Sequence, residues 1–299
     1  MKDESIVAEN ERLRIYKENV NTGETHELWL GDYVITSKAE LAERKKRIDE
    51  KTQMFARSEA RFVWAIYKLS ARLFEELKES YVSMLFFLAT FCGWSGHLTT
   101  GRKDIRKADL PKLLDMSRET VNRFWNAIVK AGIAREDEDG LLYLNEDYFR
   151  KGKLNNETVG ELSQKHTAIS RLYVNSVRDL YKRATPRSRK TLAYLFLMIP
   201  YVNLDYNVVC YNPLEEDLEK IEPMNLNELS KTIGYGEENA SRLLNNLLKL
   251  KFTVLAKEEA AVRGVLSDVD GRREYKLFVS PDVYYAGRNW DEVKVLGKF

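Results

Sequence analysis

Apolar side chains recur every three or four positions through much of this chain, which is the spacing of amphipathic helices. The N-terminal part differs, because strand-like runs over 14–20 and 25–30 flank a polar turn and predict a β-hairpin. Beyond it, a charged helix is expected over 37–50 and an amphipathic helix over 63–77. Residues 1–80 are therefore assigned to an N-terminal hairpin and helical extension.

Residues 81–153 follow the plan of a winged helix-turn-helix domain. An apolar helix over 81–92 and a short helix over 107–115 precede a turn, after which Ser117 can cap a third helix. Gly132 is expected to end that helix, and two short strand-like segments then form the wing. The predicted buried face of the third helix consists of Val121, Phe124, Trp125, Ile128 and Val129.

A connecting helix is predicted over residues 154–184. Apolar residues from Val159 to Leu180 keep a spacing of three and four, which is too regular for a flexible linker. Such a stripe packs against the rest of the chain or joins two copies of it, so a homodimer through this helix is possible. His166 lies on the stripe and is expected to be a packed core residue rather than a ligand or an acid–base group.

Residues 185–299 repeat the plan. An N-capped apolar helix comes first, and further helices are expected over 226–233 and 239–251. The predicted wing strands are 252–255 and 274–279, joined by a long loop. The expected fold is mainly α with small β wings, in which two winged helix-turn-helix domains are joined by a long helix.

The two halves also end alike. Segments 143–152 and 277–287 both run from leucine or aromatic residues through Asn-Glu-Asp or Ser-Pro-Asp to further aromatic residues and a glycine. This pattern resembles the end of the winged helix in RepL-type plasmid and phage replication proteins, and segment 19–24 resembles their start. The resemblance covers residues 15–152 best, and those relatives usually have one winged helix rather than two. It implies DNA binding in a mobile genetic element and leaves replication and transcription control open.

In a winged helix, exposed side chains at the start of the third helix reach base edges, where Arg recognises guanine and Asn recognises adenine. The candidate DNA contacts of the first domain are Arg102, Lys103, Ser117, Arg118, Thr120, Asn122, Arg123 and Asn126. Those of the second domain are Asn239, Ser241, Arg242 and Asn245, with Arg263, Arg272 and Arg273 on its wing. The four acidic residues 136–139 would repel phosphates, so the first wing is expected to stay off DNA.

The composition restricts the classes of function. The formal net charge is only +2, so a nucleic-acid binder must rely on local basic clusters such as Arg102–Lys107 and Lys182–Lys190. The three histidines lie far apart, and neither zinc-ligand spacing nor a phosphate-binding glycine loop is found, so no enzyme activity, metal or cofactor is expected. The sequence Gly93-Trp94-Ser95-Gly96 is interpreted as a helix-ending turn rather than a serine nucleophile.

The chain has no apolar run long enough for a membrane span and no N-terminal signal peptide, so a cytoplasmic location is expected. Cys92 and Cys210 sit in apolar sequence and are predicted to be buried, reduced thiols. The expected function is sequence-specific binding of double-stranded DNA by a phage or plasmid protein, as a replication initiator or a transcription regulator. The alternative is a protein-binding adaptor that contacts the replication or transcription machinery. A tyrosine-based DNA strand transferase would need an Arg/His/Arg frame around one Tyr, which is not found.

Overall fold

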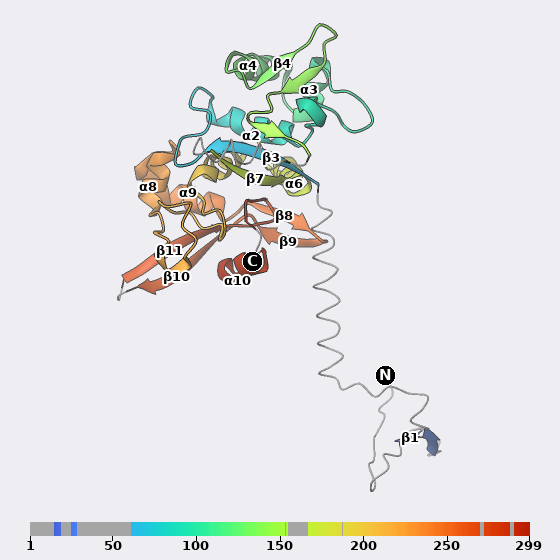
Figure 1. Ribbon diagram of the computed structural model, residues 1–299, viewed down its shortest axis with the longest axis vertical. Coiled ribbons are helices and arrows are strands. Elements are labelled where there is room, and N and C mark those ends of the chain that lie inside the picture. Colours follow the sequence, from blue (N-terminus) through green and yellow to red (C-terminus); the bar gives the residue numbers. More distant parts are fainter. Residues whose placement is uncertain are drawn as a thin grey trace. The chain divides into compact units, whose positions relative to one another are not determined.

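The computed structural model describes residues 61–152, 154, 167–186, 188–269, 272–287 and 290–299, and the strands β1 (Ile15–Glu18) and β2 (Thr25–Leu28) (Figure 1). The chain divides into two compact units, Met1–Glu59 and Ala60–Phe299. In the first unit β1 pairs antiparallel with β2, so a hairpin is present where the sequence predicts one. The helix expected over 37–50 lies outside the described residues.

The second unit is built around a four-stranded antiparallel sheet with the strand order β12-β7-β3-β6. Its strands are β3 (Phe62–Lys68), β6 (Phe149–Arg150), β7 (Thr167–Tyr173) and β12 (Tyr284–Tyr285). The central strands β3 and β7 pair along their whole length, and each flanking strand comes from the end of one half of the chain. The two halves therefore share one sheet.

Two helices, one from each half, cover the same face of this sheet. Helices α2 (Glu79–Ala89) and α7 (Ser188–Leu197) are buried along most of their length. They pack against each other, and the rings of Phe86 and Phe196 stack with centroids 4.3 Å apart and an interplanar angle of 3°. Beneath them, the buried hydroxyls of Tyr67 and Ser170 lie 2.7 Å apart across β3 and β7. This hydrophobic core is continuous through both halves.

The remaining elements lie on either side of this centre (Figure 1). The first half adds α3 (Leu110–Leu114), α4 (Arg118–Lys130), β4 (Ala134–Glu136) and β5 (Leu142–Leu144). The second half begins with α6 (Val174–Arg183) and adds α8 (Leu226–Thr232), α9 (Ala240–Leu247), β8 (Lys251–Val254), β9 (Lys257–Ala260), β10 (Val262–Val269), β11 (Arg272–Val279) and α10 (Trp290–Gly297). Short 3-10 turns occur at Trp94–Gly96, Lys107–Asp109, Ile199–Tyr201, Leu218–Lys220 and Glu237–Asn239.

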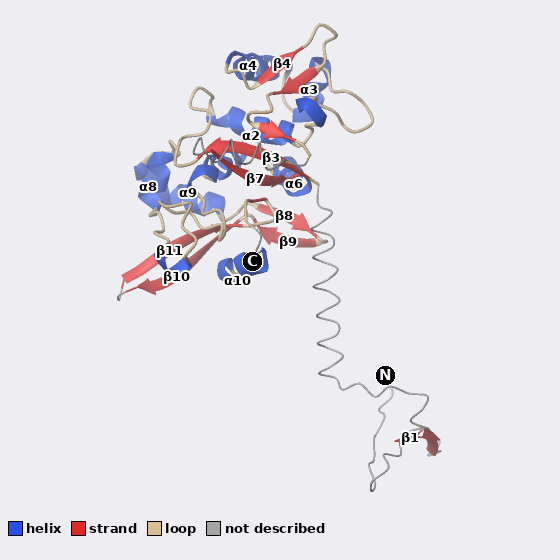
Figure 2. Ribbon diagram, in the orientation of Figure 1, coloured by secondary structure: helices blue, strands red, loops and turns tan. Residues whose placement is uncertain are grey.

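The described residues of the second unit form a mixed α/β structure, with eight α-helices and ten strands in four antiparallel sheets (Figure 2). The prediction of a mainly α protein made of two winged helix-turn-helix domains joined by a long helix is therefore wrong. Both predicted domains, 81–153 and 185–299, lie within one compact unit. The physical reason is the central sheet and the α2–α7 pair, which bury residues of both halves in one core.

The connecting helix is the clearest local error. Residues 167–173 form β7, and α6 begins only at Val174. Val177 and Leu180, two residues of the predicted stripe, are buried in this chain's own core. His166 lies outside the described residues.

Two further elements differ from the prediction. The helix expected over 63–77 is replaced at its start by β3, in which Val63, Ala65 and Tyr67 face the core in alternation. The predicted second wing, 252–255 with 274–279, is two separate hairpins, because β8 pairs with β9 and β11 pairs with β10.

Candidate nucleic-acid interface

Helix α4 has one fully buried face and one exposed face. Val121, Phe124 and Ile128 have an exposed fraction of 0% and anchor the helix in the core. The opposite face carries exposed Arg118, Asn122, Arg123 and Asn126, as the sequence predicts. Val129 is 40% exposed, so its predicted place in the buried face is wrong, because the position lies on the edge of the apolar stripe.

The start of α4 is fixed by its own side chains. The Ser117 hydroxyl oxygen accepts the Thr120 backbone N–H at 3.3 Å and donates to Thr120 Oγ1 at 3.0 Å, so the predicted N-cap is confirmed. The hydroxyl groups of Ser117 and Thr120 are thus engaged with each other at the start of the helix. Contacts to DNA from this face would then come from the longer side chains. At the other end Gly132 has φ +70°, the left-handed conformation that ends a helix.

Two of the candidate cations already have acidic neighbours. Arg123 Nη2 lies 3.4 Å from Glu119 Oε1, one turn away on the same exposed face. Lys103 Nζ lies 3.0 Å from Asp109 Oδ1, and Asp109 also accepts the Arg106 backbone N–H, which together lower the pKa of its carboxyl. Arg102 is exposed on the turn beside Lys103. Arg118, at the start of α4, is also exposed.

The turn before α4 is held by two residues of the second half that the sequence analysis did not assign to the site. Arg189 on α7 donates to the Asp115 carbonyl oxygen at 3.0 Å and to Asp115 Oδ2 at 2.9 Å. Tyr181 on α6 donates to the Leu114 carbonyl oxygen at 2.9 Å, and burial raises the pKa of its phenol to about 12. Arg189 belongs to the basic cluster Lys182–Lys190, yet it is only 5% exposed and does not face solvent.

The equivalent surface in the second half is less suited to DNA. Ser241, Arg242 and Asn245 are exposed on α9, as predicted. However, exposed Glu237 and Glu238 directly precede this helix, and the Asn239 side-chain amide donates to Glu238 Oε1 at 2.7 Å. Two carboxylates at this end oppose phosphate binding.

The predicted wing arginines of the second half do not lie on a long loop. Arg263 is exposed on β10, and Arg272 and Arg273 lie on β11, paired in register with Val269 and Asp268. They belong to a different sheet from the β8–β9 hairpin that follows α9. The side chains of Arg272 and Arg273 lie outside the described part of the structure.

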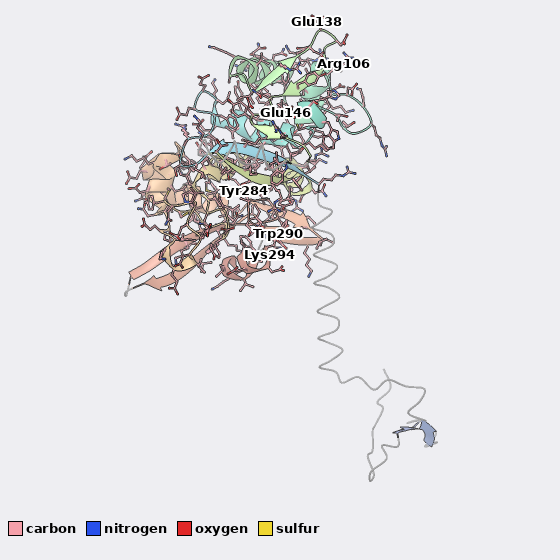
Figure 3. The ribbon with its side chains drawn as sticks, in the orientation of Figure 1. Arg106, Glu138, Glu146, Tyr284, Trp290 and Lys294 are labelled. Atoms are coloured by element: carbon pink, nitrogen blue, oxygen red, sulfur yellow. The ribbon has the colours of Figure 1, made fainter. Side chains whose placement is uncertain are left out.

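The β4–β5 hairpin has an acidic tip. Asp137 accepts the backbone N–H groups of Leu141 at 2.8 Å and Asp139 at 3.1 Å, which lowers the pKa of its carboxyl. Figure 3 shows Glu138 at the tip and Arg106 on the neighbouring loop, from which Arg106 Nη1 donates to the Asp139 carbonyl oxygen. The acidic side chains at the tip oppose the binding of DNA phosphates to this hairpin.

The outer face of this hairpin carries a row of aromatic and cationic side chains. The Arg135 guanidinium carbon lies 4.0 Å from the centroid of the Tyr143 ring. The ring centroids of Tyr143 and His97 are 5.4 Å apart. Trp94, on the preceding turn, is 70% exposed. The Gly93–Gly96 sequence is thus a turn, as predicted, and it presents an indole to solvent.

Both cysteines are buried and free, and burial raises the pKa of each thiol to about 12. Residues 61–299, apart from the undescribed positions, contain no group of three or more His, Cys, Asp or Glu side chains that could hold a metal ion. None of the described helices combines the length and apolar character needed to cross a membrane. A scan against protein-family models and a search of curated proteins found no match to this chain.

Proposed function

We propose that this chain binds double-stranded DNA sequence-specifically, with the exposed face of α4 in the major groove. The observation that carries the proposal is the row of Arg118, Asn122 and Asn126 at four-residue spacing on a helix whose other face is completely buried. Side chains at this spacing lie on one face of a helix. Arg and Asn are the side chains that recognise guanine and adenine bidentately, and a rigid helix presents them at fixed positions.

The dimensions of the surface fit this mode of binding. A helix of 13 residues such as α4 is roughly 20 Å long at about 1.5 Å per residue and enters a groove about 12 Å wide. Arg102, exposed on the turn beside Lys103, is the best candidate for a phosphate contact in the first half. The expected biological roles are those implied by the RepL-type resemblance, replication initiation or transcription regulation in a phage or plasmid.

The test is selection of binding sites from a pool of random duplexes, followed by substitution on the selected site. Asn122→Ala is expected to weaken binding to that site by about 5- to 150-fold, the range of a lost bidentate base contact, while binding to random duplex stays unchanged. Lys130→Ala, an exposed cation at the far end of the same helix, is the matched control. If no duplex is enriched, or if Asn122→Ala weakens both duplexes equally, the proposed base contact is wrong.

A second candidate function is protein binding, and the acidic β4–β5 hairpin favours it. Exposed Trp94, together with Arg135 and Tyr143, belongs to the residue types that dominate protein interfaces. The salt dependence of duplex binding separates the two functions, because contacts to phosphates weaken steeply as salt rises. A chain that binds no duplex at low salt is better described as a protein-binding adaptor.

A further inference from the structure

The exposed face of α4 carries one carboxylate among its candidate base contacts. Glu119 lies in the first turn, three residues before Asn122 and four before Arg123, so the three side chains share one side of the helix. The side chain of Glu119 is 80% exposed and that of Arg123 is 61% exposed. On a surface that binds a polyanion, a carboxylate is unfavourable unless it makes a specific contact. Its presence beside Asn122 therefore calls for a role in recognition.

The backbone at Glu119 is held on both sides. The Ser117 hydroxyl oxygen accepts the Thr120 backbone N–H at 3.3 Å, which fixes the first turn of α4. Val121, two residues after Glu119, is fully buried in the core. A carboxylate on this turn keeps a constant position relative to Asn122. When α4 lies in the major groove, Glu119 enters the groove with it.

Glu119 also gives Arg123 a direction. Arg123 Nη2 lies 3.4 Å from Glu119 Oε1, and the acidic residue precedes the basic one, which is the more favourable order for a pair one turn apart. A guanidinium has several N–H donors, so a contact to Glu119 leaves others for the O6 and N7 acceptors of guanine. The carboxylate likewise has a second oxygen that can accept from a base. The two residues can therefore act on DNA together.

The chemistry of the base edges restricts the base that Glu119 can recognise. An ionised carboxylate only accepts hydrogen bonds, and the O6 and N7 atoms of guanine and the O4 atom of thymine are acceptors as well. Adenine presents its N6 amino donor beside the N7 acceptor, whereas cytosine presents the N4 amino donor alone. Cytosine is the base that suits Glu119 best. A base without a donor leaves the desolvated carboxylate unpaired, which costs free energy.

The spacing of the two side chains limits where their bases lie. One turn of an α-helix rises about 5.4 Å, and successive base pairs of B-DNA are about 3.4 Å apart. Residues one turn apart on α4 therefore reach bases about one or two steps apart when the helix follows the groove.

We propose that Glu119 is a specificity-determining residue of α4, whose carboxylate accepts a hydrogen bond from the N4 amino group of a cytosine and holds Arg123 toward a nearby guanine. This inference rests on the proposed function. It adds the base pairs that this part of α4 prefers, and it gives the one carboxylate on the face the task of rejecting other bases.

The test compares the wild type with two variants on duplexes that differ only at the proposed cytosine, with binding followed by fluorescence anisotropy. The wild type is expected to prefer cytosine by about 5- to 150-fold, the range of one good base contact. Glu119→Gln is expected to move the preference to adenine, because glutamine pairs with the N6 and N7 atoms of that base. Glu119→Ala is expected to lose the preference, to weaken the guanine preference at the neighbouring position, and to bind random duplex about 1.5- to 5-fold more tightly, since an exposed like charge is removed.

Glu138→Gln is the matched control, because Glu138 is an exposed carboxylate at the tip of the β4–β5 hairpin and its loss changes the net charge equally (Figure 3). This variant is expected to keep the base preference of the wild type. All variants are expected to unfold at nearly the same temperature, since exposed ion pairs contribute little to stability.

If the selected duplexes show no cytosine preference that depends on Glu119, or if Glu138→Gln changes the preference as much, the inference is wrong. That result leaves the base contact of Asn122 standing, because Asn122→Ala is tested on the same duplexes. If the wild type enriches no duplex at all, the proposed function itself fails, and the role of Glu119 falls with it.

Discussion

The Arg189 contact across the two halves gives a stability prediction that can be worked out in numbers. Arg189→Met keeps an unbranched apolar stem and removes the guanidinium group, with its charge and its donors. The Arg189 guanidinium donates to the Asp115 carbonyl oxygen at 3.0 Å and to Met116 Sδ at 2.9 Å, and its carbon lies 4.6 Å from the centroid of the Tyr181 ring. These partners lie on α6 and on the turn between α3 and α4, so the substitution affects the support of α4.

Three effects determine the magnitude. A carbonyl group that loses its buried donor costs about 1–3 kcal/mol. The ion pair with Asp115 contributes about 0–1 kcal/mol, because the Asp115 side chain is 87% exposed. Methionine recovers part of this loss, since the buried Arg189 Nε has no hydrogen-bond partner in the described structure and its desolvation cost disappears. The expected net loss in the free energy of unfolding is about 2 kcal/mol, or roughly a 30-fold change in the folding equilibrium.

Urea unfolding followed by tryptophan fluorescence measures this loss, because Trp125 is buried on α4. Asp115→Asn is the control. This substitution removes the ion pair with Arg189, and asparagine tolerates the left-handed φ of +51° at this position. The free energy of unfolding is therefore expected to change by less than about 1 kcal/mol. If Arg189→Met unfolds within about 0.5 kcal/mol of the wild type, a size typical of surface substitutions, Arg189 does not support this turn and the reasoning is wrong.

Three further predictions concern the packing. Gly96→Ala is expected to destabilise the protein more than Gly101→Ala by at least about 1 kcal/mol in thermal unfolding, because both glycines have positive φ but only at Gly96 does a Cβ atom clash with backbone, at 2.0 Å from the Leu144 carbonyl oxygen. Both thiols are expected to resist a thiol reagent at pH 8 until the chain unfolds, since burial raises their pKa to about 12, and early reaction would contradict the core position. A fragment of residues 1–184 is expected to show no cooperative unfolding transition, because it lacks α7 and β12, and a folded fragment would refute the shared core.

The parts of the structure that depend on neighbouring residues in the sequence could be predicted. The exposed and buried faces of α4, its cap at Ser117 and its end at Gly132 follow from the helical period and from local hydrogen bonding. The exposed candidates on α9 follow in the same way. Residues whose role depends on distant partners could not be found by this route. Arg189 has the sequence neighbourhood of a surface cation, and only the fold shows that it is buried against the turn before α4.

The strand β7 shows why the fold class was wrong. Ile169, Tyr173 and Val177 are four residues apart, so they fit a helical stripe, although Ile169 and Tyr173 lie in a strand. The buried face of β7 instead carries Ala168, Ser170 and Leu172, two of which are too small to stand out in a hydrophobic pattern. Hydrophobic periodicity detects large side chains. It did not predict this strand because two of the three side chains on its buried face are small.

Those small residues in turn explain the architecture. Ala65 on β3 lies opposite Ser170 on β7, and the space above such a pair is open to helices that approach the sheet closely. Helices α2 and α7 stack Phe86 on Phe196, one from each half, and Phe86 also meets Phe149, the β6 residue that pairs with Ala65. If each half formed a separate domain, it would need large side chains on its own strands to bury a core by itself. The small residues at the middle of the sheet therefore go together with the single core that the two halves share, and a larger residue at Ser170 would displace the Tyr67 hydroxyl that lies 2.7 Å from it.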